Sequence, residues 1–238
     1  MKVRSIGPRA APRLIDGSTH VGPCEVIGVI GKRGTGKSTA AKKMLADALD
    51  DGMRVLVFDP HDEYSRHGRE SDTVKLGPLD DRTTIDELIA DPEILDDDKL
   101  SLAVVPRGEP EECAQDFDAL VTLVTSTADL LFAVEELGYF EEHARGRINF
   151  LATQSRHFSV PVMLVAQRIV QIPKTARTQL TQVISFRQDN PDDLRALAEL
   201  AGDPFASDVS ALGRGQFRHW RDTPPAAAAA PSKEKKTQ

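Results

Sequence analysis

One stretch near the start of the chain reads Val26-Ile27-Gly28-Val29-Ile30-Gly31-Lys32-Arg33-Gly34-Thr35-Gly36-Lys37-Ser38-Thr39. Its apolar first part is typical of a buried strand, and the residues after Ser38 favour a helix. Between them lies the pattern G-x-x-x-x-G-K-S, which forms a phosphate-binding loop when a strand precedes it and a helix follows. The stretch therefore predicts a nucleoside triphosphate site built from residues 31–39.

The residue types in this loop suit a triphosphate. Glycine lets the backbone curl until successive N–H groups face the phosphates, and a helix that starts near Lys37 adds the positive end of its dipole. We expect Lys37 to reach the β- and γ-phosphates and the Ser38 hydroxyl to bind Mg²⁺. The alternative is a glycine-rich turn without a ligand, which accounts for Gly31 and Gly36 but leaves Lys37 and Ser38 unexplained.

Length and composition indicate an ordinary globular chain. The 238 residues can bury a sizeable core, and the hydrophobic share of 40% and charged share of 28% are common values. A net charge of −7 argues against a surface that binds nucleic acid everywhere, but it leaves room for a local basic strip. The sequence has no apolar run near the roughly 18 residues of a membrane span and no signal-peptide core behind Met1, so we expect a cytoplasmic protein.

The simplest organisation is one α/β domain over residues 21–222, with a flexible arm at 1–20 and a disordered Ala/Pro/Lys tail at 223–238. Hydrophobic periodicity and turn residues place its elements. The expected strands are 26–30, 54–59, 100–105, 130–134, 160–166, 183–186 and 213–220, with a weak one at 73–76, and the expected helices are 38–50, 84–90, 111–127, 148–158, 175–180 and 191–201. Strand, loop, helix, strand is a βαβ unit, so we predict a mainly parallel β-sheet flanked by helices on both faces.

A second chemical landmark is the run Asp129-Leu130-Leu131-Phe132-Ala133-Val134, which leads into Glu135 and Glu136. In nucleotide hydrolases a strand of this form delivers carboxylates to the metal ion and to the attacking water. We therefore expect Glu135 to support Mg²⁺ and Glu136 to polarise the water. The alternative is an amphipathic helix that begins with the two glutamates, because apolar runs this short do not separate strand from helix.

The strand expected at 160–166 is followed directly by Gln167 and Arg168. In an open parallel sheet this strand end lies at the edge where the γ-phosphate should sit. A side-chain amide at Gln167 can detect whether that phosphate is present.

Four stretches, in this order, resemble the FtsK/HerA superfamily of RecA-like P-loop ATPases, which pump DNA. They are Gly31–Ser38, Phe58-Asp59-Pro60-His61-Asp62-Glu63-Tyr64, the strand that ends in Glu135-Glu136, and Val162-Met163-Leu164-Val165-Ala166-Gln167-Arg168. The phosphate loop is shared by many families, whereas the Asp-Pro-His turn and the Ala-Gln-Arg strand end are far more specific. The resemblance spans residues 25–200 and implies a RecA-like fold.

The resemblance also implies an assembly. Members of the superfamily form rings, usually hexamers, that thread double-stranded DNA through the centre at the expense of ATP. On their pattern Gln167 matches the sensor of the γ-phosphate, and Arg156 matches an arginine presented to the ATP of the neighbouring subunit. Such an arginine stabilises charge that develops on the transferred phosphoryl group. Arg145 and Arg147 are rivals for this trans-acting role, and a solvated arginine is the alternative for Arg156.

Two departures from the family pattern matter. Glu135 stands where the family usually has Asp, although its longer arm can still hold Mg²⁺ through water. The sequence also shows neither the membrane anchor and winged helix of the chromosome-segregation pumps nor the N-terminal barrel of the HerA helicases. A bare motor of this size resembles the genome-packaging ATPases of membrane-containing icosahedral viruses, which fill a preformed capsid. This resemblance implies a capsid or membrane vertex protein as partner, and a place in the host cytoplasm or on the virion.

The leading hypothesis is an oligomeric ATPase that translocates double-stranded DNA independently of sequence, through basic side chains on pore loops. Lys174 and Arg177 are candidates for those contacts, although a solvated charged face explains each equally well. A conjugation or secretion motor of the same superfamily, an ATP-binding assembly switch with little turnover, and a small-molecule kinase stay open. Glu136 argues against the switch, and no arginine-rich lid segment supports the kinase.

Overall fold

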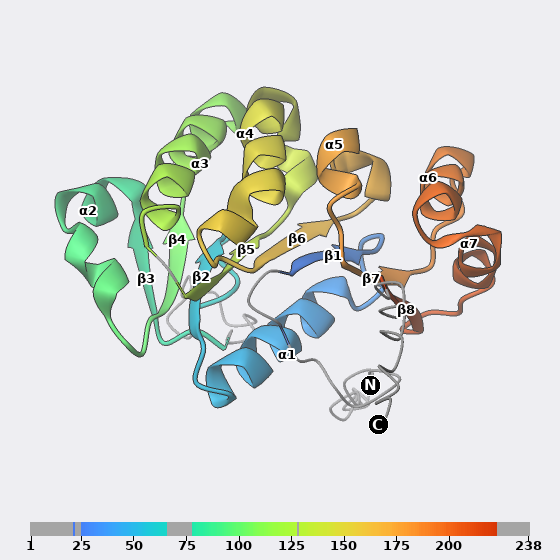
Figure 1. Ribbon diagram of the computed structural model, residues 1–238, viewed down its shortest axis with the longest axis horizontal. Helices are drawn as coiled ribbons and strands as arrows, with labels where there is room; N and C mark the ends of the chain where they lie inside the picture. Colours follow the sequence, from blue (N-terminus) through green and yellow to red (C-terminus); the bar gives the residue numbers. More distant parts are fainter. Residues whose placement is uncertain (1–20, 22–24, 66–77, 128, 223–238) are drawn as a thin grey trace, which may run out of the picture.

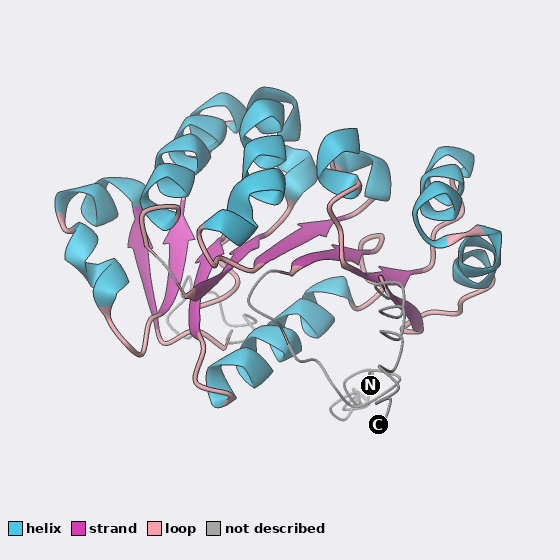
Figure 2. Ribbon diagram, in the orientation of Figure 1, coloured by secondary structure: helices cyan, strands magenta, loops and turns pink. Residues whose placement is uncertain are grey.

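The computed structural model describes residues 21, 25–65, 78–127 and 129–222. Within these ranges eight strands form one sheet: β1 (Val26–Ile30), β2 (Arg54–Phe58), β3 (Asp81–Thr84), β4 (Ser101–Val105), β5 (Leu130–Val134), β6 (Val162–Ala166), β7 (Gln182–Phe186) and β8 (Phe217–Arg221). The α-helices of the same ranges are α1 (Lys37–Asp50), α2 (Ile85–Ala90), α3 (Pro110–Val124), α4 (Glu141–Gln154), α5 (Lys174–Arg177), α6 (Pro191–Ala201) and α7 (Asp203–Ser210). Figure 2 shows how they alternate with the strands. Short 3-10 turns include η2 (Leu137–Tyr139), η3 (Ser155–His157) and η4 (Ile169–Gln171).

The strands lie in the order β3-β4-β2-β5-β6-β1-β7-β8. Neighbouring strands are parallel except β7 and β8, which run antiparallel at one side of the sheet. The register pairs Val26 with Val162 and Ile30 with Ala166, so β1 and β6 end side by side. The carboxyl ends of the parallel strands therefore meet at one edge of the sheet, which is where open α/β folds bind their ligands.

Helices cover both faces of the sheet, as the βαβ pattern predicts. Figure 1 shows α1 on one face and α2 to α7 on the other. On the α1 face, Met44 and Leu45 pack into one apolar cluster with Ile27 and Val29. The core of the opposite face is larger and contains four phenylalanine rings grouped around Phe117, which contacts Phe58, Phe132 and Phe140. Burial of both faces explains why the central strands are apolar without interruption.

The structure corrects some of the predicted boundaries. The helix expected at 148–158 is α4, which begins at Glu141 and ends at Gln154. Its first two turns are mainly polar, so hydrophobic periodicity does not reveal them. The helix expected at 175–180 is the shorter α5, and the last strand is β8 rather than 213–220. Hydrophobic periodicity does not predict β3 and α7, because β3 consists of four polar residues and α7 is a short helix next to α6.

Three predicted segments lie outside the described residues, namely the arm at 1–20, the weak strand at 73–76 and the tail at 223–238. The limits of the predicted domain, 21–222, stay a prediction. In the part of the chain that the structure describes, no helix is long and apolar enough to cross a membrane.

Candidate nucleotide-binding site

The predicted phosphate loop connects β1 to α1 at the carboxyl edge of the sheet. The Gly31 N–H donates to the Ala166 carbonyl at 3.1 Å, which ties the loop to the end of β6. Gly36 has a φ of 107°, which L side chains rarely adopt, and it turns the chain into the helix that begins at Lys37. The N–H groups of a helical first turn have no carbonyl partner within the helix, so those of Lys37 to Thr39 can bind an anion.

A cleft of about 570 Å³ opens over this loop. Its lining comes from the loop itself and from the segments after β2, β5 and β6, and comprises Lys32, Arg33, Gly34, Gly36, Lys37, Ser38, Thr39, His61, Glu63, Glu136 and Gln167. Residues from all four stretches that carry the family resemblance thus meet in one place. Gly31 and Thr35 lie outside this lining, since Gly31 faces Phe186 and the Thr35 hydroxyl donates to the Lys32 carbonyl at 2.7 Å.

Lys37 and Ser38 meet the two glutamates that follow β5. The Lys37 ammonium lies 3.4 Å from Glu135 Oε1 and 3.6 Å from Glu136 Oε1. The Ser38 hydroxyl donates to Glu135 Oε1 at 3.1 Å. Burial raises the pKa of Glu135, and the charge of Lys37 opposes that rise. The run before the two glutamates is the buried strand β5, which ends at Val134. The alternative interpretation, an amphipathic helix that begins with the glutamates, is therefore wrong.

The second carboxylate oxygen of Glu135 is a candidate ligand for a cation. Glu135 Oε2 is buried and has no hydrogen-bond partner in the described residues, although buried polar atoms normally have one. Ser38 and Glu135 present hard oxygen atoms, the donors that Mg²⁺ prefers, so these residues fit a divalent cation. The described chain contains no group of three or more acidic, His or Cys side chains that could hold a metal. A cation here would take its other ligands from phosphate and water.

Gln167 lies directly after β6 and contacts Glu136. Its side-chain Nε2 donates to Glu136 Oε2 at 3.1 Å. Glu136 has a φ of 45° and a ψ of 48°, in the left-handed region that few residues other than glycine adopt. Backbone strain of this kind concentrates at functional sites. The structure thus joins the two side chains for which the sequence predicts water polarisation and γ-phosphate detection.

The first half of the chain matches a known family. Residues 25–136, just under half of the sequence, match the family model described as "Helicase HerA, central domain". This region is similar to the central domain of HerA. It contains the phosphate loop, the Asp-Pro-His turn after β2 and both glutamates. Comparison with curated protein sequences gives no match.

Solved structures share the fold of this chain. The genome packaging NTPase B204 of Sulfolobus turreted icosahedral virus 2, in complex with AMPPCP, aligns with a TM-score of 0.63 and 17% identity over 84% of this chain and 93% of its own. The cytoplasmic domain of the type VII secretion ATPase EccC of Thermomonospora curvata aligns with a TM-score of 0.52 and 14% identity, over 86% of this chain and 24% of its own. At these identities the likeness shows the fold. The family match and the shared fold make this chain similar to FtsK/HerA-type P-loop ATPases.

The turn after β2 supports the cleft in a way that residue patterns do not reveal. Asp59 is fully buried, and its Oδ2 accepts the N–H groups of Glu63 at 2.7 Å and Tyr64 at 2.8 Å. Burial raises the pKa of Asp59 to about 6, although both N–H donors oppose the rise. His61 therefore comes to line the cleft, with its ring 5.9 Å from that of Tyr139. In the sequence, the only indication that His61 lines the cleft is the family-specific Asp-Pro-His turn itself.

The raised pKa of Asp59 predicts how stability varies with pH. A carboxyl group whose pKa is higher in the folded state than in the unfolded state stabilises the fold while protonated, so this contribution is lost as the pH rises from 3.8 through about 6. Asp59→Asn keeps an oxygen acceptor for the two N–H groups but carries no charge. We expect it to be more stable than the wild type by roughly 1–3 kcal/mol at pH 8, and equally stable below pH 4.

Urea denaturation of both proteins at pH 4, 6 and 8, without nucleotide or Mg²⁺, measures this difference. A wild-type protein that is the more stable of the two at pH 8 would show that the Asp59 carboxylate is stabilised by its surroundings instead.

The three candidate trans-acting arginines lie in different surroundings. Arg147 Nε lies 2.9 Å from Asp118 Oδ1 and so joins α4 to α3. Arg145 is exposed and lies 3.4 Å from Glu141 in the same helix. Arg156, in η3, is exposed and forms no hydrogen bond or ion pair within the described chain. Because η3 precedes β6, Arg156 lies near the amino edge of the sheet, opposite to its own nucleotide cleft. Arg156 is thus separated from the nucleotide cleft of its own chain.

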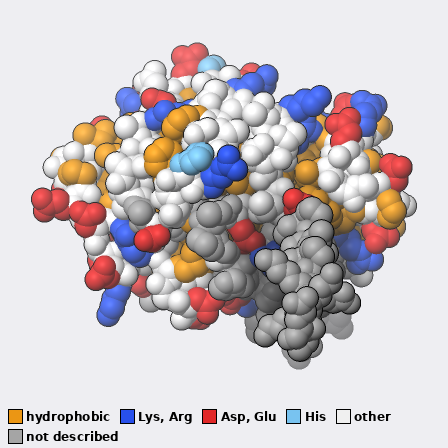
Figure 3. All heavy atoms as spheres, in the orientation of Figure 1, with side chains coloured by type: hydrophobic (Ala, Val, Ile, Leu, Met, Phe, Trp, Pro, Cys, Tyr) orange, Lys and Arg blue, Asp and Glu red, His pale blue; other side chains and the backbone are white. Residues whose placement is uncertain are grey.

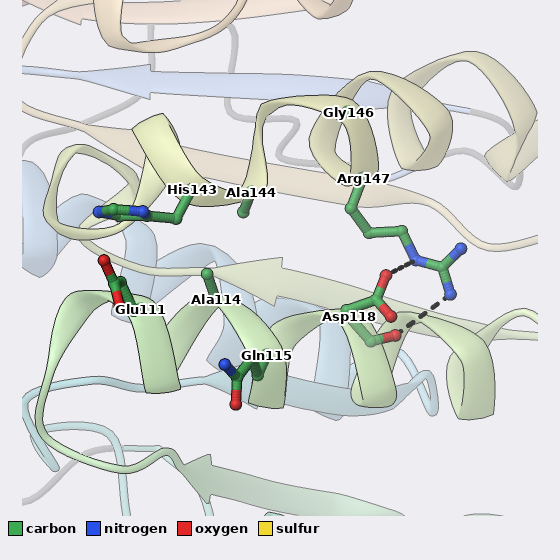
Figure 4. A pocket seen from close by; sticks show the side chains of 8 residues that line it. All are labelled: Glu111, Ala114, Gln115, Asp118, His143, Ala144, Gly146 and Arg147. Atoms are coloured by element: carbon green, nitrogen blue, oxygen red, sulfur yellow. Dashed lines mark hydrogen bonds and ion pairs between the residues drawn. The ribbon is translucent and has the colours of Figure 1, made fainter.

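A second concavity of about 540 Å³ lies between α3 and α4 (Figure 4). Small residues line it, namely Ala114, Ala144 and Gly146, and the pair Arg147 and Asp118 closes one end. It shares no lining residue with the cleft over the phosphate loop. This concavity is therefore separate from the predicted nucleotide site at the carboxyl edge of the sheet.

Proposed function

We propose that this FtsK/HerA-type ATPase translocates double-stranded DNA and packages a viral genome into a preformed capsid. The observation that carries the proposal is the likeness to B204, a genome packaging NTPase, which extends over 93% of the B204 chain and 84% of this one. The shared fold thus extends over most of both chains. The EccC domain, by contrast, is matched over 24% of its length.

The site contains the groups that hydrolysis needs. Lys37 can neutralise charge on the β- and γ-phosphates, and Glu136 can orient the attacking water and accept its proton. Mg²⁺, held by the Ser38 hydroxyl and the Glu135 carboxylate, would stabilise the charge that develops on the phosphate oxygens. Gln167 donates to Glu136 within the cleft, so its amide is placed to contact both that carboxylate and a γ-phosphate.

The proposed assembly is a homo-oligomeric ring, a hexamer on the family pattern. The cleft lies at the carboxyl edge of the sheet and Arg156 near the amino edge. A head-to-tail contact between subunits therefore places Arg156 of one subunit beside the cleft of the next, and head-to-tail contacts close into rings when the rotation allows it. In such a ring each cleft is completed by its neighbour.

The charge distribution gives the ring a preferred orientation around DNA. The segment 78–100, which contains β3 and α2, has nine carboxylates and two cations, a net charge of −7. This equals the net charge of the whole chain, so all other residues together are neutral. Figure 3 shows the acidic side chains at the left, where α2 lies. Since duplex DNA is a dense polyanion, we propose that this end faces away from it.

The basic residues of α5 are the proposed DNA contacts. Lys174 is exposed, whereas Arg177 is half-buried and its Nε lies in the interior. α5 is tied to α4 through the Ala176 N–H, which donates to Asn149 Oδ1 at 3.1 Å. Lys174 is therefore the better placed of the two to contact phosphates in the pore.

ATP turnover in the presence of DNA tests the proposal. Rates are measured without nucleic acid, with single-stranded DNA and with long duplex DNA, each at about 50 mM and about 200 mM salt. We expect duplex DNA to stimulate most, and the stimulation to disappear at the higher salt, because a protein with six to ten phosphate contacts loses about 10³–10⁵ in affinity over this range. A rate that neither form of DNA changes would contradict DNA translocation.

The same measurement separates the alternatives. A conjugation motor would respond most to single-stranded DNA, and a secretion motor, for which the likeness to EccC is the specific observation, would respond to a protein substrate. An assembly switch would bind ATP and turn over little. The position of Glu136 between Lys37 and Gln167 argues against the switch, since a protein that does not hydrolyse ATP has no use for this carboxylate.

The packaging proposal also implies a partner and a location. A capsid or membrane vertex protein would hold the ring at the site of DNA entry, in the host cytoplasm, and the motor could stay with the virion. Co-sedimentation of the ATPase with assembling capsids tests this part. Failure to co-sediment, with duplex stimulation intact, would limit the proposal to DNA translocation.

A further inference from the structure

Gln171, the last residue of η4, holds the backbone that carries Gln167. Its Oε1 accepts the backbone N–H of Gln167 at 3.1 Å and that of Arg168 at 3.0 Å. These are the first two N–H groups after β6. One side-chain oxygen therefore closes the chain into a turn at the point from which the Gln167 amide extends into the cleft.

Other residues hold the same turn from the segment after β7. The buried Gln188 side chain donates its Nε2 hydrogen to the Gln167 carbonyl at 3.1 Å. The buried Asp193 carboxylate accepts the Arg168 Nε hydrogen at 2.9 Å. Gln171 differs from these two residues because it also lies against the segment that follows Glu136.

Gly138 shows this second contact. It belongs to η2, which begins directly after Glu136. A Cβ atom at position 138 would overlap the side-chain amide of Gln171, so the two residues can pack together only because residue 138 is glycine. Gln171 thus contacts both turns, and the bond from Gln167 Nε2 to Glu136 Oε2 spans the gap between them.

We propose that Gln171 is a positioning residue for ATP hydrolysis, which fixes the Gln167 amide relative to the Glu136 carboxylate. Gln171 does not line the nucleotide cleft, so it acts through Gln167. The inference rests on the role proposed above for Gln167. A displacement of about 1 Å in a catalytic group can cost on the order of 100-fold in rate. Loss of the two hydrogen bonds to Gln171 Oε1 should therefore lower the rate of ATP turnover.

Substitution of Gln171 by methionine tests the proposal, because Met has nearly the same length but cannot accept the two N–H groups. We expect Gln171→Met to lower kcat by about 10- to 100-fold while the KM for ATP changes by less than about twofold. Gln171→Glu keeps the acceptor oxygens and should recover most of the lost kcat. Gln179→Met makes the same change at an exposed position and serves as the matched control.

Gly138→Ala tests the same contact from the other side, because the added methyl group would push the Gln171 amide away. We expect a loss of kcat similar to that of Gln171→Met. In the double variant the two losses should not multiply, since both remove one interaction. Thermal denaturation of each variant shows whether the protein is folded, and binding of a fluorescent ATP analogue shows whether the cleft is intact.

Three outcomes decide the matter. A folded Gln171→Met protein with wild-type kcat, alongside an inactive Gln167→Ala protein, would overturn the positioning role and leave the role of Gln167 intact. Wild-type kcat in Gln167→Ala would remove the premise instead. A Gln171→Glu protein as impaired as Gln171→Met would show that acceptance of the two N–H groups is not what Gln171 contributes.

Discussion

Replacement of Lys37 by alanine is expected to lower kcat for ATP by at least about 100-fold, because loss of one charge-stabilising donor in a closed site costs roughly 10²–10³. In the structure the Lys37 ammonium lies between Glu135 and Glu136, at the first turn of α1. When ATP is bound, the same ammonium group can reach the β- and γ-phosphates. Phosphate release at saturating ATP and Mg²⁺ measures the effect.

Lys43→Ala is the matched control for this variant. Lys43 lies on the same helix, is exposed and pairs with Asp47 four residues later at 2.8 Å, so its loss should leave kcat within about twofold of the wild type. Lys37→Ala also leaves two glutamates beside each other without a cation, so thermal denaturation must show that the variant is folded. A folded Lys37→Ala protein that keeps more than a small fraction of turnover would remove the phosphate-loop assignment.

The fold could be predicted where the signal is local in the sequence. The helix expected at 191–201 has the same limits as α6, because Asn190 caps it through the Asp192 N–H at 2.9 Å and Pro191 occupies its first position. The phosphate loop depends on residues within one short stretch and was predicted in the same way. By contrast, no local signal in the sequence predicts β3. Its four residues are polar, and the strand exists because it pairs with β4 at the end of the sheet.

The site could be predicted residue by residue, but not as a network. Glu135, Glu136 and Gln167 each follow an apolar strand, and parallel strands bring their carboxyl ends together, so their meeting with Lys37 follows from the fold. The bracing contacts have no such signal. Gln188 meets Gln167 from 21 positions away, and a glutamine in a loop has no pattern that names its partner. Such contacts appear only once the chain is folded.

Arg156→Ala is expected to lower ATP turnover by about 10³-fold or more in the assembled ring, the scale on which a trans-acting arginine contributes to phosphoryl transfer. Arg156 is exposed and lies near the amino edge of the sheet, about 15 Å from the carboxyl edge at 3.3 Å per strand residue. Its loss should therefore leave ATP binding by the isolated subunit unchanged. Arg195→Ala, which removes another exposed arginine, is the matched control. Arg145→Ala and Arg147→Ala test the two rivals by the same assay.

Mixing of two inactive proteins separates a trans role from a structural one. Arg156→Ala subunits keep Lys37, and Lys37→Ala subunits keep Arg156, so an interface between them can hold one intact copy of each. In rings assembled at random from equal amounts of the two proteins, about a quarter of the interfaces hold an intact Lys37 and an intact Arg156. We therefore expect up to about a quarter of wild-type turnover to return. Recovery in this mixture, with none when Arg156→Ala is mixed with the double variant, requires Arg156 to act across the interface. The geometry leaves Arg156 no access to its own cleft, so in these two variants only an interface between unlike subunits can join an intact Arg156 to an intact Lys37. Absence of recovery from mixed rings of confirmed composition would therefore contradict independent action in trans.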